Sequence, residues 1–167
     1  MFLRTTHYPL PPVVLIAHDI RSLHNVGSIF RSADAFGVEK LYLTGYTGTP
    51  PRKEIAKTAL GSQDRVVWER RDDAVALISE LKKQGVNVLA LDNREGAVDI
   101  SSVIARSGAT KQSPVALVLG NEVDGIPSAV LAACDGTVEI PLPGHKRSLN
   151  VAVATGIALF ALTRKMG

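Results

Sequence analysis

The sequence predicts an α/β fold with a mainly parallel sheet and flanking helices. Short apolar runs of strand length alternate with stretches of helical periodicity along the chain, which is the pattern of repeated strand-helix-strand units. The first run, at residues 13–17 (VVLIA), has no polar residue, as expected for a strand covered on both faces. The 167 residues are 46% apolar and 21% charged, which suits one soluble globular domain.

A helix is expected after the first strand, because apolar residues recur at helical spacing until Gly37 stops the pattern. These residues are Val26, Ile29, Phe30, Ala33 and Phe36. Asn25 is expected to cap the start of this helix. A second strand is predicted at residues 39–44, where Leu41 and Leu43 alternate with polar neighbours.

The middle of the chain continues the alternation. Residues 65–69 (RVVWE) predict a short strand, whose Trp68 we expect to pack in the core or at a sheet edge rather than to stack on a base. A well-capped amphipathic helix is expected over residues 72–84, followed by a strand over 86–91. Residues 100–110 show no clear periodicity, so no element is predicted there.

The last third of the chain contains the two most informative loops. Strand-length runs at Val115–Leu119 and at 138–140 each stop at a Gly or Pro cluster before a helix-like stretch begins. In an α/β sheet, loops at the carboxyl ends of strands bring backbone to a small molecule. In the first loop, residues 119–127 (LGNEVDGIP), glycines permit close approach and polar side chains lie between them. An ordinary strand-turn-helix connection could use the same residues.

The second loop, within residues 140–154 (IPLPGHKRSLNVAVA), is stiff and basic. Two prolines restrict its backbone, and His145, Lys146 and Arg147 follow them. A basic loop that runs into an apolar helix indicates contact with an anion or a nucleic acid. The formal net charge of +3 permits nucleic-acid binding without requiring it.

Three segments resemble the ordered motifs of the SpoU/TrmH-like RNA ribose 2′-O-methyltransferases, a family of the SPOUT class. They are residues 25–37 (NVGSIFRSADAFG), 120–127 (GNEVDGIP) and the loop of residues 140–154, and together they extend over most of the chain. Ala152 stands where the family often has a second Ser, which we do not expect to abolish activity. The resemblance implies a SPOUT fold with a deep carboxyl-terminal trefoil knot, and one methyltransferase domain over residues 1–167 without a separate RNA-binding domain.

The resemblance further implies an enzyme that transfers a methyl group from S-adenosyl-L-methionine to a ribose 2′-hydroxyl of RNA. Nine residues are expected to bind the cofactor through backbone, apolar and polar contacts. They are Leu119, Gly120, Asn121, Glu122, Gly125, Ile140, Leu142, Ser148 and Leu149.

The catalytic residues implied by the resemblance are Asn25, Arg31, Glu122, Ser148 and Asn150. Periodicity alone would make Arg31 a solvated surface residue, whereas in similar proteins the arginine at this place is essential for methyl transfer. Because a guanidinium is a poor proton acceptor, we expect Arg31 to hold a phosphate and stabilise the developing alkoxide. Glu122 could instead brace its loop by accepting hydrogen bonds from backbone amides.

Seven residues are candidates for RNA binding. They are Arg31, Arg52, Lys53, Lys57, His145, Lys146 and Arg147. An ordinary charged helix start is an alternative for those at positions 52, 53 and 57. These side chains can hold phosphates but read few bases, so we expect a locally exposed loop of tRNA as substrate, with rRNA as the alternative. An RNA-binding module without catalysis is disfavoured, because the polar motif residues are present.

Other classes of protein find little support in the sequence. There is no Walker A pattern and no Gly-x-Gly-x-x-Gly after the first strand, and the four histidines lack ligand spacing, so no metal is expected. The single cysteine, Cys134, excludes an internal disulfide and is expected to be a buried structural thiol.

The two ends of the chain bear on the cellular location of the protein and on its oligomeric state. Residues 1–12 lack the apolar core of a signal peptide, and the apolar stretch at 149–162 is too short to span a bilayer. We therefore expect a cytoplasmic protein without a membrane partner. The final helix is apolar all round, so it must be buried, and a homodimer is expected to cover it. The resemblance implies that such a dimer completes the site with residues of both subunits.

Overall fold

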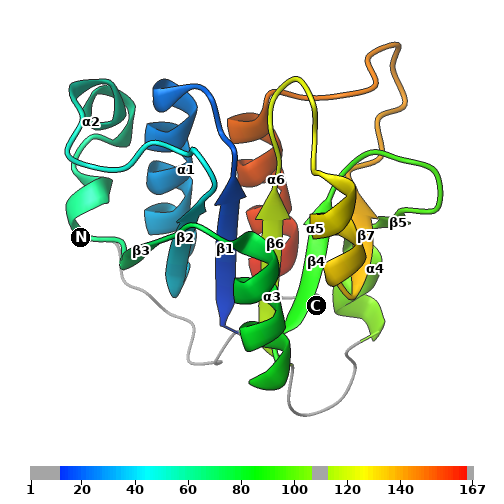
Figure 1. Ribbon diagram of the computed structural model, residues 1–167. Helices are drawn as coiled ribbons and strands as arrows, with labels where there is room; N and C mark the ends of the chain where they lie inside the picture. The colour runs from blue at the N-terminus through cyan, green and yellow to red at the C-terminus, as the bar shows by residue number, and fades with distance from the viewer. Residues whose placement is uncertain (1–11, 107–112, 165–167) are drawn as a thin grey trace.

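A computed structural model, which describes residues 12–106 and 113–164, shows a parallel seven-stranded sheet (Figure 1). The strands are β1 (Val13–His18), β2 (Lys40–Thr44), β3 (Trp68–Arg71), β4 (Asn87–Leu91), β5 (Val98–Asp99), β6 (Val115–Leu119) and β7 (Gly136–Glu139). Their order in the sheet is β3-β2-β1-β6-β4-β7-β5, and all pairings are parallel. Every residue of β1 and β6 is buried, as their continuous apolar sequences predicted.

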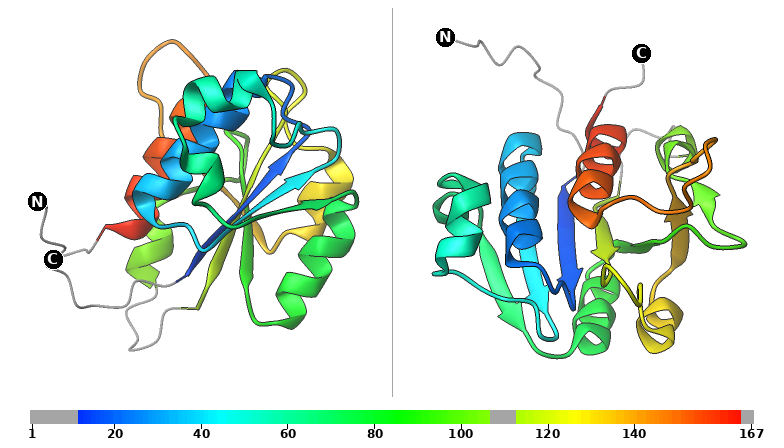
Figure 2. Two further views of the ribbon diagram at one scale, coloured as in Figure 1. Left: turned by 90° about the vertical axis from the view of Figure 1, so that its left-hand side faces the viewer. Right: turned by 90° about the horizontal axis from the view of Figure 1, so that it is seen from above.

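Helices cover both faces of this sheet (Figure 2). They are α1 (Leu23–Phe36), α2 (Lys53–Ala59), α3 (Ala74–Lys83), α4 (Ser101–Arg106), α5 (Ser128–Ala133) and α6 (Val151–Thr163). The alternation of side chains along β1 divides the core into two layers. Leu15 and Ala17 pack in the layer of α1 and α6, whereas Val14 and Ile16 pack in the layer of α3 and α5. The predicted α/β fold with a parallel sheet is confirmed.

The two ends of α1 differ in how well the sequence predicted them. The Asn25 cap is wrong, because Ser22 is the N-cap and its hydroxyl oxygen accepts a hydrogen bond from the Asn25 N–H at 3.1 Å. Asn25 therefore lies in the first turn, and its side chain is available for contacts elsewhere. The predicted stop is confirmed, since Gly37 has a φ of 68° that favours glycine.

The strand predicted at 65–69 begins three residues later, at Trp68. The backbone N–H groups of Arg65 and Val66 donate to the Ser62 carbonyl oxygen, at 3.1 and 2.9 Å, so both residues belong to a turn before the strand. The Arg65 guanidinium binds the Asp34 carboxylate of α1, with Nη2 and Oδ2 2.6 Å apart. Trp68 packs edge-on against Phe30, with ring centroids 6.4 Å apart. Its expected role as a packed aromatic is confirmed.

Two further segments differ from the prediction, and a third lies almost wholly outside the described residues. Helix α4 occupies part of the segment at 100–110 for which no element was predicted, and residues 107–112 lie outside the described part of the chain. The strand expected at 138–140 runs over Gly136–Glu139 instead, and it pairs with the unpredicted two-residue strand β5. The amino-terminal segment 1–12, for which no signal peptide is expected, also lies outside the described residues, except for its last residue.

Cys134 ends α5, where the sequence placed it. Its thiol donates a hydrogen bond to the Val130 carbonyl oxygen at 3.2 Å, and burial raises the pKa of the thiol to about 11. Because the thiolate is the reactive form of cysteine, this environment supports a structural thiol.

Helix α6 lies beside α1 on one face of the sheet and buries only part of its apolar surface. Thr155, Ala158, Leu159 and Leu162 are buried, whereas Val153, Ile157 and Phe160 are exposed in the single chain. Among the described residues, no helix combines the length and hydropathy needed to cross a membrane.

Candidate active site

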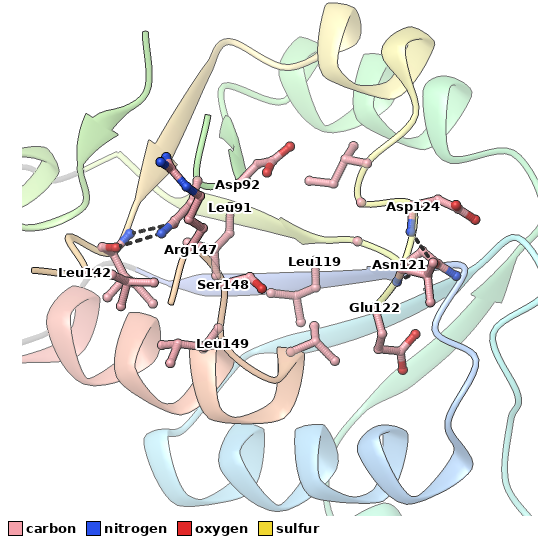
Figure 3. Close-up of a pocket in the computed structure, with 18 residues that line it drawn as sticks. Leu91, Asp92, Leu119, Asn121, Glu122, Asp124, Leu142, Arg147, Ser148 and Leu149 are labelled. Atoms are coloured by element: carbon pink, nitrogen blue, oxygen red, sulfur yellow. Dashed lines mark hydrogen bonds between the residues drawn. The ribbon is translucent and has the colours of Figure 1, made fainter. Parts of the chain in front are cut away.

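Three loops at the carboxyl ends of neighbouring strands enclose one cleft of about 360 Å³. The loops follow β4, β6 and β7, which are adjacent in the sheet. Arg147, Ser148 and Leu149 lie along one side of the cleft, and Asn121, Glu122 and Asp124 lie along the other (Figure 3). All nine residues predicted to bind a cofactor line this cleft.

The cleft also contains residues that the sequence did not assign. Asp92 and Asn93 belong to the polar segment 92–96 (DNREG) after β4, whose composition fits a ligand loop and an ordinary turn equally well. Ile126, Val151 and Ala154 add apolar surface but lie in stretches where an apolar residue signals only core packing. Hydrogen bonds join both amide atoms of the Asn93 side chain to the backbone of Ile140, at 3.1 and 3.3 Å. The β4 loop thus helps to position the β7 loop.

A tight turn closes the loop after β6. The backbone groups of Asn121 and Gly125 bond to each other in both directions, at 3.1 and 3.0 Å. The Asn121 side-chain oxygen accepts from the N–H groups of Val123 and Asp124, each at 2.8 Å. A Cβ on Gly120 would lie 2.5 Å from Ile126 Cγ1 and 2.8 Å from the Gly125 carbonyl carbon. The turn therefore requires glycine at position 120.

Glu122 connects this turn to the start of α1. Its carboxylate accepts hydrogen bonds from the backbone N–H groups of Arg21 and Ser22, at 3.0 and 3.2 Å, and from the Asn25 side-chain amide at 3.0 Å. Partial burial raises the pKa of Glu122, but these hydrogen bonds outweigh it and hold the pKa below its ordinary value of 4.5. The side chain is an ionised brace at neutral pH, as the alternative interpretation of Glu122 expected.

Asn25 and Asn150 extend this contact to the third motif. The Asn150 amide donates to the Asn25 side-chain oxygen at 3.3 Å. The Asn150 oxygen also caps α6, because it accepts from the N–H groups of Ala152 and Val153 at 2.8 and 3.4 Å. Hydrogen bonds therefore link the three motifs through Glu122, Asn25 and Asn150.

Arg31 lies apart from the cleft of its own chain. It is exposed on α1 and lines a separate surface groove between α1 and α2. Lys57 lines the same groove, and Arg52 and Lys53 are exposed at the start of α2. His145 and Lys146 are exposed in the loop before α6, while Arg147 reaches the cleft. The single chain thus brings four of the five predicted catalytic residues together, but not Arg31.

The lining of the cleft fits S-adenosyl-L-methionine. Apolar side chains offer surface to an adenosine group, and three carboxylates against one guanidinium favour a ligand that carries a positive sulfonium. The carboxylates belong to Asp92, Glu122 and Asp124, and the guanidinium to Arg147. Within the described ranges, no three His, Cys, Asp or Glu side chains group as a metal site.

The family model and the similar proteins all name RNA methyltransferases. The pattern of the SpoU rRNA Methylase family matches residues 12–160. A 23S rRNA (guanosine-2′-O-)-methyltransferase RlmB of Xanthomonas axonopodis pv. citri is 35% identical over 153 residues. That match covers 92% of this chain and 59% of the relative, so the chain spans well under two thirds of the relative's length.

Two solved structures share the fold. An AdoMet-bound rRNA methyltransferase from Sinorhizobium meliloti superposes with a TM-score of 0.80 at 30% identity, covering 94% of this chain and 57% of that one. A structure that concerns the 2-OH methylation of C/U34 on tRNA superposes with a TM-score of 0.75 at 28% identity. This second match covers 90% of this chain and 93% of that one.

Proposed function

The chain belongs to the SpoU rRNA Methylase family, and from this premise we propose that it transfers a methyl group from S-adenosyl-L-methionine to a ribose 2′-hydroxyl of RNA. The parallel sheet with flanking helices is that of the SPOUT methyltransferases, and this fold implies the carboxyl-terminal trefoil knot. One observation carries the proposal: the three motifs meet at a single cleft, where Glu122, Asn25 and Asn150 are joined by hydrogen bonds.

The cleft assigns a role to each group of residues. Leu119, Ile140 and Leu149 offer apolar contacts to the adenosine, while Asp92 and Asp124 favour the positive charge. The bound cofactor supplies an activated methyl group that needs no metal. The protein's task is therefore to hold the methyl group and the ribose oxygen in line and to keep the surrounding loops fixed.

We propose that a homodimer completes the site. Arg31 does not line the cleft of its own chain, so the guanidinium that stabilises the ribose alkoxide comes from Arg31 of a partner subunit. The exposed apolar residues Val153, Ile157 and Phe160 of α6 lie on the helix that packs beside α1. A partner that covers them would approach the surface that carries Arg31.

Replacing Ile157 with lysine is expected to yield monomers, because the charge would have to be buried in the dimer. Light scattering at micromolar concentration measures the mass directly. Val75→Lys on α3 is the matched control, since Val75 and Ile157 are 39% and 40% exposed in the single chain. This control should remain dimeric. A monomeric wild-type protein would refute the dimer proposal.

The relatives support rRNA as the substrate, in place of the tRNA expected from sequence. The relative at 35% identity is a 23S rRNA enzyme, and the Sinorhizobium structure is an rRNA methyltransferase. A tRNA substrate is the second candidate, since the structure concerned with tRNA is matched over 93% of its length. The basic side chains of α2 and of the loop before α6 would hold phosphates in either case.

Transfer of tritiated methyl groups to separated RNA pools distinguishes these candidates. We expect label in rRNA. Labelling should weaken as the salt concentration rises, because binding to phosphates releases counterions and added salt therefore lowers the affinity for RNA. The control is the same RNA incubated with the Ile157→Lys protein. Label confined to tRNA would overturn the rRNA proposal while leaving the reaction type intact.

A further inference from the structure

Tyr46 is an exposed aromatic residue beside the cleft. Its side chain is 58% exposed, and it lies two residues after β2. Since β2 and β6 flank β1 in the sheet, the loops after β2 and β6 come together at the carboxyl end of β1. The Asn121 side chain that lines the cleft reaches across this end to the Tyr46 ring.

Both ends of Tyr46 are held by hydrogen bonds. Its backbone N–H donates to the Asp19 carboxylate at 2.9 Å, and its hydroxyl oxygen accepts from the Asn121 amide at 2.5 Å. The same amide donates to the Asp19 carbonyl oxygen at 2.9 Å. The backbone of Tyr46 is therefore bonded to the β1 loop, and its ring hydroxyl to the β6 loop.

The residues on either side of Tyr46 are also fixed. The Arg70 guanidinium donates to the carbonyl oxygens of Gly45 and Thr47, at 2.5 and 2.9 Å. The buried Thr47 hydroxyl donates to the Ala17 carbonyl oxygen at 2.9 Å. The backbone around Tyr46 and the hydroxyl of its ring are therefore held before a ligand arrives, which reduces the entropy cost of binding.

Other large aromatic residues of the described chain are engaged elsewhere. Trp68 packs against Phe30, Tyr42 is buried, and Phe160 lies on the α6 face assigned to the dimer. Tyr46 differs because its ring is both fixed and open to solvent at the edge of the sheet that holds the cleft.

We propose that the Tyr46 ring is a stacking platform for an unpaired base of the RNA substrate. The inference rests on the proposed function, since a ribose can reach the cleft only if its nucleotide leaves the regular helix. Unstacked bases are bound on aromatic rings in single-stranded RNA recognition. A base on Tyr46 would lie next to the Asn121 turn, and its neighbouring ribose could then enter the cleft.

The test compares Tyr46→Leu with Tyr46→Phe. Anisotropy of a fluorescein-labelled single-stranded oligoribonucleotide measures RNA affinity, and calorimetry measures cofactor affinity. Tyr46→Leu should bind the RNA about tenfold more weakly, as expected for one lost base stack. Tyr46→Phe keeps the ring but removes the hydroxyl that accepts from Asn121, so it should lose clearly less affinity than Tyr46→Leu. The slope of affinity against salt should not change, because no phosphate contact is removed.

Val67→Ala is the control for loss of an exposed apolar side chain. Val67 is 60% exposed and precedes β3, at the amino end of the parallel strands, whereas Tyr46 follows the carboxyl end of β2. Its replacement should therefore leave RNA affinity unchanged. Near-ultraviolet circular dichroism checks that each variant is folded. If Tyr46→Leu fails to fold, Tyr46→Trp replaces it and is compared with Tyr46→Phe, since both lack the hydroxyl. The larger ring should bind RNA at least as tightly as Phe.

Four outcomes would overturn the stacking role. They are equal losses in Tyr46→Phe and Tyr46→Leu, unchanged affinity in Tyr46→Leu, weaker binding by Tyr46→Trp than by Tyr46→Phe, and a change of oligomeric state in Tyr46→Leu. Equal losses would show that the hydroxyl only braces Asn121. Methyl transfer by the wild-type protein is measured in parallel. Ring-dependent RNA binding without any methyl transfer would refute the proposed function and leave the stacking platform in place.

Discussion

Replacing Gly120 with alanine is expected to weaken S-adenosyl-L-methionine binding by about tenfold to a hundredfold, the range that overpacking costs of 1–3 kcal/mol imply. The added Cβ would lie 2.5 Å from Ile126 Cγ1 and under 3.0 Å from the Gly125 and Ile126 backbone. Backbone atoms cannot rotate away, so the turn at Asn121 must move and distort the cleft. Calorimetric titration measures the change.

Gly136→Ala is the matched control for Gly120→Ala. Its Cβ would meet only Leu89 Cδ2 at 3.5 Å, an ordinary contact. This variant should bind the cofactor like the wild type, and wild-type binding should survive a chelator because no metal takes part. Wild-type cofactor affinity in a folded Gly120→Ala protein would place the cofactor elsewhere.

Replacing Arg31 with alanine is expected to lower kcat for methyl transfer by about a hundredfold or more, the usual loss when a donor to a developing oxyanion is removed. Cofactor affinity should not change, because Arg31 does not line the cleft of its own chain. Single-turnover methyl transfer and calorimetry separate the two effects. Arg31→Lys should recover only part of the rate, since an ammonium lacks the planar fork of guanidinium.

Mixed dimers test where Arg31 acts. When the Arg31→Ala and Gly120→Ala chains are co-expressed, one site of the mixed dimer combines an intact cleft with an intact Arg31 from the other subunit. Activity should therefore exceed that of either variant alone. Lys83→Ala, on the exposed end of α3, is the control for loss of a surface charge. An active Arg31→Ala enzyme, or a mixture without recovery, would contradict the composite site.

The elements predicted best from the sequence are the strands that are buried on both faces. β1 and β6 are buried along their whole length, so their continuous apolar runs were sufficient. The cap of α1 could not be settled locally, because Ser22 and Asn25 are both good capping residues. Which of the two caps the helix depends on Glu122, which lies 97 residues from Asn25 in the chain. The Glu122 carboxylate accepts a hydrogen bond from the Asn25 side-chain amide.

The cofactor cleft was also predictable only in part. Leu119 ends β6, and the other eight predicted residues lie in the loops after β6 and β7, whose Gly, Pro and polar content matches the family motifs. Ile126, Val151 and Ala154 were missed because apolar residues near helix starts give no sign that they face a cavity. The position of Arg31 outside the cleft of its own chain depends on the tertiary fold, which helical periodicity does not report.

The most direct test of the central claim is the identity of the methylated nucleoside. RNA labelled by the purified protein with tritiated S-adenosyl-L-methionine is digested to nucleosides and separated by liquid chromatography. The proposed reaction predicts label in a 2′-O-methylated nucleoside, and almost none when Arg31→Ala replaces the wild type. Label on a base would contradict the ribose chemistry, and a folded dimer that binds the cofactor but labels no RNA would contradict the proposed function.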